Sequence, residues 1–349
     1  MAEKFRVALS GDFKKADGSP TFPDFDVAPL RNAPGVEVAY IDATSPIQAS
    51  QLADFDALIL LIPRFARESI PADSRLSVVA RFGVGYDNVD VEACTEAGIA
   101  LCITPDGVRR PVAVSIIALM LALTGKLLIK DKLTRSGPEA FNKRVDHMGV
   151  GLVGRTLGSI GIGNIGAELF RLAKPFDMKF MAHDPFADRQ VAAELGIELV
   201  GMEDLFRRAD VLCVNCPLTP ETKHLVNAER LALMKPTAFL INTARGPIVD
   251  QKALTKVLTE RRIAGAGLDV LEAEPPAPDD PILKLDNTIL TPHALCWTDQ
   301  CFAGNGAADV KAVLDIQHGR TPRGVVNRAV LDGPRFKARL EAYRSRFGG

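Results

Sequence analysis

The stretch from Ser159 to Pro185, SIGIGNIGAELFRLAKPFDMKFMAHDP, constrains the fold of this chain more than any other segment. Glycines at 161, 163 and 166 stand between an apolar run and a segment with helical periodicity, and a second apolar run ends on Asp184. Core packing does not require glycines at this spacing. We therefore predict a strand, a tight turn, a helix and a second strand, with the backbone of the turn open to close approach by a ligand.

The ligand that suits such a turn carries phosphate, because a helix N-terminus presents free N–H groups and a partial positive charge. Gly161 permits the tight turn, Gly163 lets a pyrophosphate approach the backbone, and Gly166 lets the helix pack on the sheet. The carboxylate of Asp184 can accept hydrogen bonds from both ribose hydroxyls and would repel a 2′-phosphate. The stretch predicts a dinucleotide site that prefers NAD to NADP, with three purely structural glycines as the alternative.

Short apolar runs alternate with helix-like segments along most of the chain, which is typical of parallel sheets covered by helices on both faces. Strands are predicted at Arg6–Ser10, Glu37–Asp42, Ala57–Ile62, the start of Ser77–Asp90, Ile99–Thr104, Thr156–Ile162, Lys179–Asp184, Val211–Asn215, Ala238–Asn242, Gly265–Asp269 and Thr288–Leu290. A further helical stretch and a short tail follow Pro292. The predicted fold class is α/β with two Rossmann-like domains. A nucleotide-binding domain, residues 104–298, is inserted into a substrate domain, residues 1–103 and 299–349.

Composition narrows the class of partner. The chain has 349 residues, a formal net charge of −1 and no long run of Lys or Arg, which argues against nucleic acid or an anionic membrane. The N-terminal sequence MAEKFRVALSGDF shows no secretory signal, and the longest apolar run, Val112–Thr124, is short for a membrane span. A cytoplasmic location is therefore expected. The same run predicts either a buried core helix or a subunit interface, and a homodimer is expected.

The six cysteines do not suggest a disulfide framework in a chain of this length. Cys213 and Cys216 form a C-x-x-C pair that could indicate zinc or redox chemistry. A strand would point the two sulfurs to opposite faces, and no second C-x-x-C occurs. We predict reduced thiols and no metal site.

Polar side chains follow three of the later predicted strands. Arg245 comes after one, Asp269 and Glu274 after the next, and His293 after the last. Ligands of open α/β sheets bind at the carboxyl ends of parallel strands. Arginine offers a planar fork to a carboxylate, and histidine can give a proton to a carbonyl oxygen near neutral pH. A nearby carboxylate favours the charged imidazolium and fixes its ring. The set therefore suits hydride transfer to a 2-oxo acid.

Six segments resemble the D-isomer-specific 2-hydroxyacid dehydrogenase family and occur in the family's order over nearly the whole chain. They are RFGVGYDNVD, LGSIGIGNIG, CPLTPETKHLVN, MKPTAFLINTARGPIVD, GLDVLEAEPP and TPHA. The nearest resemblance is to the phosphoglycerate, glyoxylate and hydroxypyruvate dehydrogenase branches, without a C-terminal regulatory domain. The resemblance implies interconversion of a small D-2-hydroxy acid and its 2-oxo acid with NAD, an active site between two domains, and usually a homodimer.

The resemblance also implies roles for individual residues. Arg245 would bind the substrate carboxylate or carbonyl, and His293, paired with Glu274, would be the acid/base. Backbone N–H groups of Val84 and Gly85 would hold the substrate carboxylate. Implied cofactor contacts are Gly161, Gly163, Asn164, Ile165, Gly166, Asp184, Cys216, Thr243, Ala244, Arg245, Asp269 and His293.

Some positions depart from the family pattern. Val112-Ala113-Val114 stands where many members have VAE, DGVRR at 106–110 is unusual, and ALCWT follows His293. Trp297 could shape substrate preference or simply pack at a domain boundary, and Arg64 could face a second anionic group or only solvent. Glu274 argues against formate dehydrogenases, which carry glutamine there. A phosphite dehydrogenase and an NAD-sensing, corepressor-like binding protein remain alternatives, and the particular 2-hydroxy acid stays open.

Overall fold

The computed structural model describes residues 4–348, which form two compact units. Unit 1 comprises the described residues of Met1–Val108 and Trp297–Gly349, and unit 2 is Arg109–Cys296. The sequence predicts these boundaries after residues 103 and 298, so the observed inserted unit is five residues shorter at its start and two residues shorter at its end. Both differences come from packing within unit 1. A Cβ on Gly107 would lie 2.6 Å from the backbone nitrogen of Asn305, and Trp297 packs edge-on against Phe302 at 5.5 Å.

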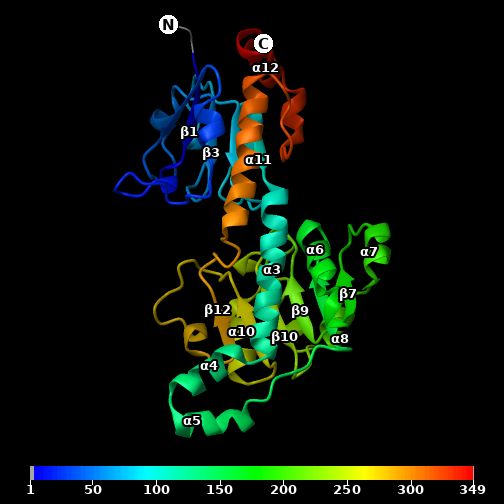
Figure 1. Cartoon of the computed structure of the whole chain (residues 1–349). Helices are drawn as coiled ribbons and strands as arrows, with labels where there is room; N and C mark the ends of the chain where they lie inside the picture. Colours follow the sequence, from blue (N-terminus) through cyan, green and yellow to red (C-terminus); the bar gives the residue numbers. More distant parts are fainter. Residues whose placement is uncertain (1–3, 349) are drawn as a thin grey trace. The chain divides into compact units, whose positions relative to one another are not determined.

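Unit 1 is built on a five-stranded sheet in the order β2-β1-β3-β4-β5, in which every pair is parallel. Its strands are β1 (Phe5–Leu9), β2 (Val36–Tyr40), β3 (Ala57–Leu60), β4 (Val78–Arg81) and β5 (Ala100–Ile103). Its helices are α1 (Ala28–Arg31), α2 (Val91–Glu96), α11 (Asp299–Gln317) and α12 (Pro334–Phe347). All five strands fall where the apolar runs predict them, and α11 contacts β4 and β5 (Figure 1).

Unit 2 is built on a seven-stranded parallel sheet in the order β12-β11-β10-β9-β6-β7-β8 (Figure 1). Its strands are β6 (Thr156–Ile160), β7 (Lys179–His183), β8 (Ile197–Leu199), β9 (Val211–Val214), β10 (Phe239–Asn242), β11 (Gly265–Leu268) and β12 (Thr288–Leu290). The strand order reverses between β6 and β9. Open α/β sheets bind ligands outside the carboxyl ends of the strands at such a point. The fold class predicted from the sequence is confirmed.

Helices flank this second sheet. They are α4 (Leu127–Arg135), α5 (Pro138–Asn142), α6 (Asn164–Ala173), α7 (Arg189–Leu195), α8 (Met202–Arg208), α9 (Ala228–Leu231) and α10 (Gln251–Thr259), with α3 (Pro105–Thr124) entering from unit 1. A Cβ on Gly267 of β11 would lie 3.1 Å from Leu119 and from Leu123, so α3 packs directly on the sheet there.

The long apolar helix differs from its prediction. α3 begins at Pro105, ahead of the apolar run, and includes Pro111 in its interior. Within residues 4–348 it is the one helix long and apolar enough to cross a membrane by length and composition, and half of that stretch is buried in protein. Core helices pass the same test. It is not buried on all sides, however, because Val114 is 50% exposed and Leu121 is 43% exposed.

The strand β8 and the helix α12 were not predicted from the sequence. β8 has three residues, of which only Ile197 is buried, so no apolar run marks it. The predicted short tail contains the 14-residue helix α12, whose sequence is rich in charged residues. α12 is anchored through two buried rings, Phe336 and Tyr343, and the Tyr343 hydroxyl donates to the carboxylate of Asp56 at 3.0 Å.

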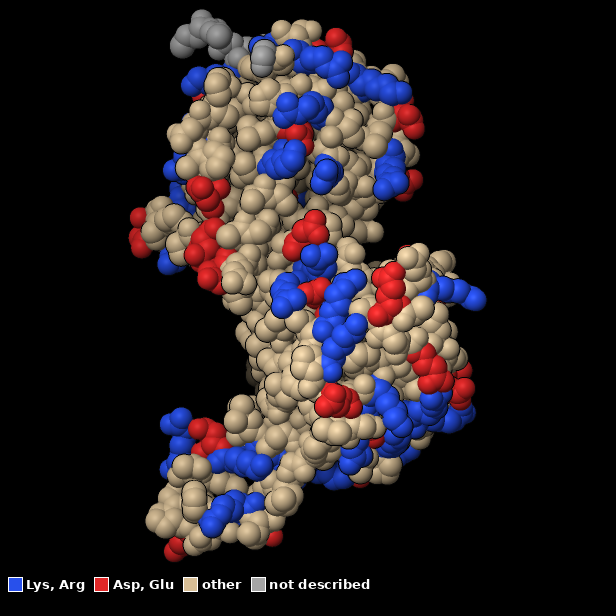
Figure 2. Space-filling model, turned by 45° about the vertical axis from the view of Figure 1, so that its right-hand side comes forward, with Lys and Arg blue, Asp and Glu red and all other residues tan. Residues whose placement is uncertain are grey.

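Charged side chains of both signs are scattered over the face drawn in Figure 2. On that face, Asp and Glu side chains lie among the Lys and Arg side chains in both units (Figure 2). This mixture agrees with the formal net charge of −1. Exposed ion pairs, such as that of Arg208 with Glu198 at 2.6 Å, contribute little to stability.

Candidate active site

The glycine turn after β6 has the geometry that its sequence predicts. Gly161 has φ +93°, and a Cβ there would lie 3.0 Å from the carbonyl oxygen of Asn215. A Cβ on Gly166 would lie 2.5 Å from the carbonyl oxygen of Gly161, so α6 approaches the strand closely. A Cβ on Gly163 would meet nothing within 4 Å, and no side chain caps α6. The helix N-terminus is therefore open on the side where a diphosphate would bind.

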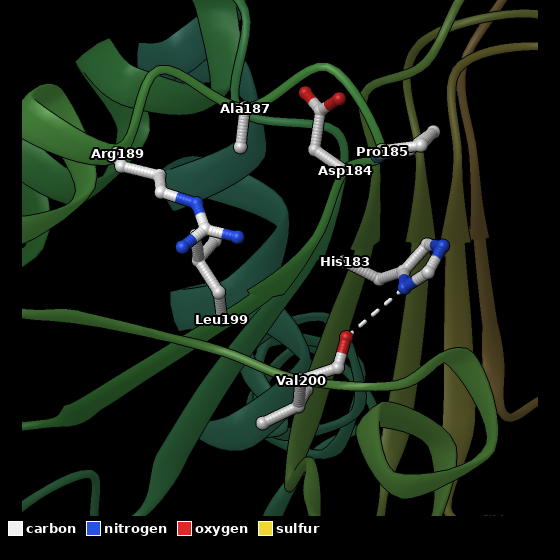
Figure 3. Close-up of a pocket in the computed structure, with 7 residues that line it drawn as sticks. All are labelled: His183, Asp184, Pro185, Ala187, Arg189, Leu199 and Val200. Carbon is white, nitrogen blue, oxygen red and sulfur yellow. Dashed lines mark hydrogen bonds between the residues drawn. The ribbon is translucent and has the colours of Figure 1, made fainter.

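Asp184 directly follows the next strand, β7, and lines a hollow of about 270 Å³ (Figure 3). Its carboxylate accepts one hydrogen bond from the N–H of Ile162 at 2.9 Å and another from the N–H of Phe186 at 2.8 Å. The first bond ties the strand end to the glycine turn. The hollow is lined by His183, Asp184, Pro185, Ala187, Arg189, Leu199 and Val200. A negative carboxylate and the guanidinium of Arg189 therefore share one hollow.

His293 and Glu274 form a hydrogen-bonded pair. His293 Nδ1 lies 2.9 Å from Glu274 Oε2, and both side chains are about two-fifths exposed. Glu274 Oε1 accepts from the N–H of Leu271 at 3.0 Å. Burial alone raises the pKa of Glu274, but the hydrogen bonds from His293 and the Leu271 N–H outweigh it, and the pKa lies below the usual value. The carboxylate is therefore anionic at neutral pH and holds the imidazole ring by Nδ1.

The backbone of His293 is strained, since φ is +54° at a residue that carries a Cβ. Its N–H donates to the carbonyl oxygen of Asp269 at 2.7 Å and to that of Thr291 at 3.0 Å. The carboxylate of Asp269, 3% exposed, accepts from the Thr291 hydroxyl at 2.6 Å and from the N–H of Ala294 at 3.1 Å. Asp269 thus anchors the loop that presents His293, a role that the sequence reading missed.

Arg245 follows β10 and is positioned by a buried amide. The side chain of Asn242, 0% exposed, accepts from the Ala244 N–H at 3.0 Å and donates to the Arg245 carbonyl at 2.9 Å. Arg245 Nη1 donates to the Ala244 carbonyl at 2.7 Å. A Cβ on Gly246 would lie 1.8 Å from the carbonyl oxygen of Leu271, so the loops after β10 and β11 touch.

These contacts bring three predicted residues to neighbouring strand ends, because Arg245, Glu274 and His293 follow β10, β11 and β12. The positive charge of Arg245 contributes to the low pKa of Glu274. The hydroxyl of Thr243, in the same loop as Arg245, is buried and has no hydrogen-bond partner among residues 4–348. Such an orphaned hydroxyl suits a polar group of a bound ligand.

The first cysteine of the C-x-x-C pair is buried and the second is partly buried. Cys213 is 0% exposed within β9, and burial raises the pKa of Cys216 to about 11, so its thiol stays protonated at neutral pH. In the described part of the chain, no three His, Cys, Asp or Glu residues are grouped to hold a metal ion. The backbone nitrogen of Cys216 would lie 3.2 Å from a Cβ on Gly161, so this residue borders the glycine turn.

In unit 1 the turn after β4 contains Val84 and Gly85, whose N–H groups have no acceptor among residues 4–348. The preceding Gly83 has φ +124°, and both its N–H and its carbonyl form hydrogen bonds with Thr104. Its N–H donates to the Thr104 hydroxyl at 2.8 Å, and the Thr104 N–H donates to its carbonyl at 2.9 Å. The Thr104 hydroxyl in turn donates to the side-chain oxygen of Asn305 at 2.7 Å. The turn is thus fixed while two N–H groups stay available for an anion.

Taken together, the reversed strand order, the open helix N-terminus, Asp184 and the strand-end Arg, Glu and His define a dinucleotide-dependent oxidoreductase. The sequence profile described as "D-isomer specific 2-hydroxyacid dehydrogenase, NAD binding domain" matches residues 117–294. The chain belongs to the D-isomer-specific 2-hydroxyacid dehydrogenase family and is an NAD-binding oxidoreductase that acts on CH–OH donors.

Individual relatives support this assignment. A glyoxylate reductase of Korarchaeum cryptofilum is 39% identical over 284 residues, covering 80% of this chain and 85% of the relative. A D-3-phosphoglycerate dehydrogenase of Methanocaldococcus jannaschii is 37% identical over 297 residues, covering 83% of this chain and 56% of the relative. The solved structure of the acyclic imino acid reductase Bsp5 with NADPH and D-Arg has a TM-score of 0.78 and 26% identity, covering 91% of this chain and 99% of that one.

Proposed function

We propose that the protein interconverts a small D-2-hydroxy acid and its 2-oxo acid with NAD, using His293 as acid/base and Arg245 as the carboxylate or carbonyl ligand. One observation carries the proposal. His293 Nδ1 is held 2.9 Å from Glu274 Oε2, and Arg245 lies at the neighbouring strand end, close enough to contribute to the low pKa of Glu274. An acid/base, its orienting carboxylate and a cation are what reduction of a carbonyl beside a carboxylate requires.

In the proposed reaction, the side chains and backbone groups of the chain have the following roles. The imidazolium of His293 gives the carbonyl oxygen its proton from Nε2, while Nδ1 stays bonded to Glu274. In the reverse direction the neutral ring takes the hydroxyl proton. In unit 2 the guanidinium of Arg245 binds the substrate carboxylate or carbonyl. The family resemblance assigns the N–H groups of Val84 and Gly85, in unit 1, to the substrate carboxylate. The nicotinamide cofactor, when bound, supplies or accepts the hydride.

The residues after β6 and β7 fit such a cofactor. The open N-terminus of α6 at Gly163 would hold the diphosphate, and Asp184 would accept from the ribose hydroxyls. The orphaned hydroxyl of Thr243 would meet a polar group at the nicotinamide end. The remaining implied contacts, Asn164, Ile165, Cys216, Ala244 and Asp269, stay predictions.

NADH oxidation by the purified protein with a panel of 2-oxo acids tests the proposal directly. Turnover with at least one 2-oxo acid is expected. NAD reduction by phosphite is measured in parallel, because phosphite oxidation would point to that alternative activity. If no 2-oxo acid supports turnover while NADH still binds, the proposed reaction is wrong and an NAD-sensing binding role takes its place.

Asp184 is expected to give NADH the higher kcat/KM, because its carboxylate repels a 2′-phosphate. Asp184→Asn keeps an acceptor for the Ile162 N–H but removes the charge, so the NADPH/NADH ratio of kcat/KM should rise about tenfold or more. Arg189 lines the same hollow and would then favour the 2′-phosphate. Asp188→Asn, at the N-cap of α7, is the matched control. Equal efficiency with the two cofactors in the unaltered protein would refute this role for Asp184.

We propose further that a second copy of the chain covers an apolar surface on unit 2. In Figure 1, α4 and α5 extend beyond the seven-stranded sheet. Exposed apolar side chains gather on α3, α4, α5 and the following segment: Val114, Leu121, Leu127, Leu128, Phe141, Val145, Met148 and Val153. A surface of this kind is seldom left in water. Light scattering should show a dimer in solution, and Leu127→Glu with Leu128→Glu should weaken it. A monomer at micromolar concentration would contradict the interface.

A further inference from the structure

Six aromatic rings in unit 1 form one connected set, the aromatic cluster. Its members are Phe13, Phe22, Phe25, Phe82, Trp297 and Phe302. The rings of Phe22 and Phe302 are stacked at 4.2 Å, and most other pairs meet edge-on or tilted. The chain contains 17 Phe, 3 Tyr and 1 Trp, so a large share of its aromatic residues is gathered here.

The aromatic cluster begins at the turn proposed to hold the substrate carboxylate. Phe82 directly precedes Gly83 and is 2% exposed. Its ring centroid lies 5.1 Å from that of Phe25, 5.3 Å from Phe13 and 5.4 Å from Phe302. The N–H groups that would bind the carboxylate therefore stand next to the apolar body of the cluster.

The aromatic cluster extends from the buried Phe82 to exposed rings at the surface. Trp297 is 42% exposed, and its ring lies 5.4 Å from Phe22, which is partly exposed. Two more apolar groups follow the strands beside this turn, Ile62 after β3 at 60% exposure and Tyr86 after β4 at 38%. Carboxyl ends of parallel strands share one edge of the sheet. The carboxylate turn is thus bordered by exposed aromatic and aliphatic side chains.

Charged groups of both signs also lie at this edge: Asp12 follows β1, Asp42 follows β2, Arg64 follows β3, Arg81 ends β4 and Asp87 lies in the turn after it. Asp12, after β1, accepts from the N–H of Ile62 at 3.0 Å and places a carboxylate beside it. Arg64 is exposed in the loop after β3, held through its own N–H to the Ser45 hydroxyl at 3.0 Å. A second anionic group on a substrate would gain from Arg64 but would meet Asp12 and lose hydration beside the rings. Carboxylates outnumber guanidinium groups among them, so charge does not favour a second anionic group at this edge.

We infer that the 2-oxo acid carries an apolar substituent, branched aliphatic or aromatic, and that the exposed faces of Trp297 and Phe22 contact it. The inference rests on the proposed function and deepens it by assigning the substrate class. Rings on one side of a carboxylate-binding turn bury an apolar substituent while the acid group stays on the N–H groups. A phosphorylated substituent would find no such partner among the aromatic cluster.

The first test compares kcat/KM for 4-methyl-2-oxopentanoate and phenylpyruvate with that for glyoxylate and 3-phosphohydroxypyruvate. The better apolar substrate should exceed both others by about tenfold or more, the gain from burying one apolar substituent. A preference for glyoxylate or the phosphorylated acid overturns the inference and leaves the proposed function intact. Failure of all four, with other 2-oxo acids also inert, removes the proposed function and the inference with it.

The second test asks whether the apolar substituent of the substrate contacts the Trp297 ring. Trp297→Ala should lower kcat/KM for the apolar acid by about 10- to 100-fold and leave that for glyoxylate close to its original value. Trp297→Phe should retain most of the preference, because a ring remains. Phe347→Ala is the matched control and should change neither value, because this partly exposed ring at the end of α12 lies 6.2 Å from Phe5, at the start of β1 and away from the carboxyl ends of the strands. An equal loss for both acids in Trp297→Ala would show a merely structural role.

Discussion

Replacing His293 by alanine is expected to lower turnover by roughly 10²–10⁴-fold, the usual size of a general acid–base contribution. The variant can no longer give the carbonyl oxygen a proton. NADH binding should survive, because the glycine turn at residues 161–166 belongs to another part of the sheet. Steady-state kinetics on the best 2-oxo acid and a fluorescence titration of NADH separate the two effects.

The chain provides a close control. His224 also has a positive φ, 51°, and pairs with a glutamate, since its Nε2 lies 2.6 Å from Glu272 Oε1. We assign His224 no part in the reaction, so His224→Ala should keep nearly normal turnover. If His293→Ala is as active as His224→Ala, the acid/base assignment is wrong and a binding role without catalysis becomes the better account.

Glu274→Gln tests whether the negative charge of Glu274, and not only its hydrogen bond, acts on His293. Reduction needs the imidazolium, so its rate falls as pH rises and the proton is lost. The pKa of Glu274 lies below its usual value, so the carboxylate is anionic at neutral pH and its negative charge attracts positive charge on the ring beside it. Glutamine keeps a hydrogen-bond acceptor but removes the charge, so the falling limb of the reduction profile should move to lower pH. Glu272→Gln is the control, and an unmoved limb in Glu274→Gln would contradict the coupling.

Much of the fold could be predicted because parallel strands buried on both faces leave continuous apolar runs. The runs at Val211–Val214 and Phe239–Asn242 are wholly buried strands, and both were predicted within one or two residues. β8 and α12 could not be predicted in the same way. β8 buries one residue, and α12 buries two rings in a charged segment, so neither carries a periodic apolar signal.

The candidate site likewise contains residues that the sequence predicts and contacts that it does not. Arg245, Glu274 and His293 could be found because each follows an apolar strand, and strand ends meet at one edge. What holds them could not be found, because it depends on contacts between loops distant in sequence. The approach of Gly246 to Leu271 is such a contact. So are the hydrogen bonds from the 291–295 loop to Asp269. The aromatic cluster joins residues 13–25 to 297–302 and is equally invisible in the linear pattern.

Arg245→Ala is expected to lower kcat/KM for the 2-oxo acid by on the order of 10²-fold or more, since charge-assisted hydrogen bonds to the substrate carboxylate are lost. Unlike His293→Ala, it should raise KM as well as lower kcat, because Arg245 is assigned to binding and orientation. Arg245→Lys keeps the charge without the planar fork and should recover only part of the loss.

The control for this change is Arg230→Ala. Arg230 Nη1 donates to the Leu225 carbonyl at 2.8 Å, much as Arg245 Nη1 donates to the Ala244 carbonyl at 2.7 Å. If Arg245 served only to brace its own loop, both variants would lose a bond of the same kind and show similar, small effects on kcat/KM. A large rise in KM confined to Arg245→Ala, partly reversed by lysine, places the guanidinium on the substrate. An unchanged KM in Arg245→Ala would instead remove Arg245 from substrate binding and leave His293 and Glu274 as the reactive pair.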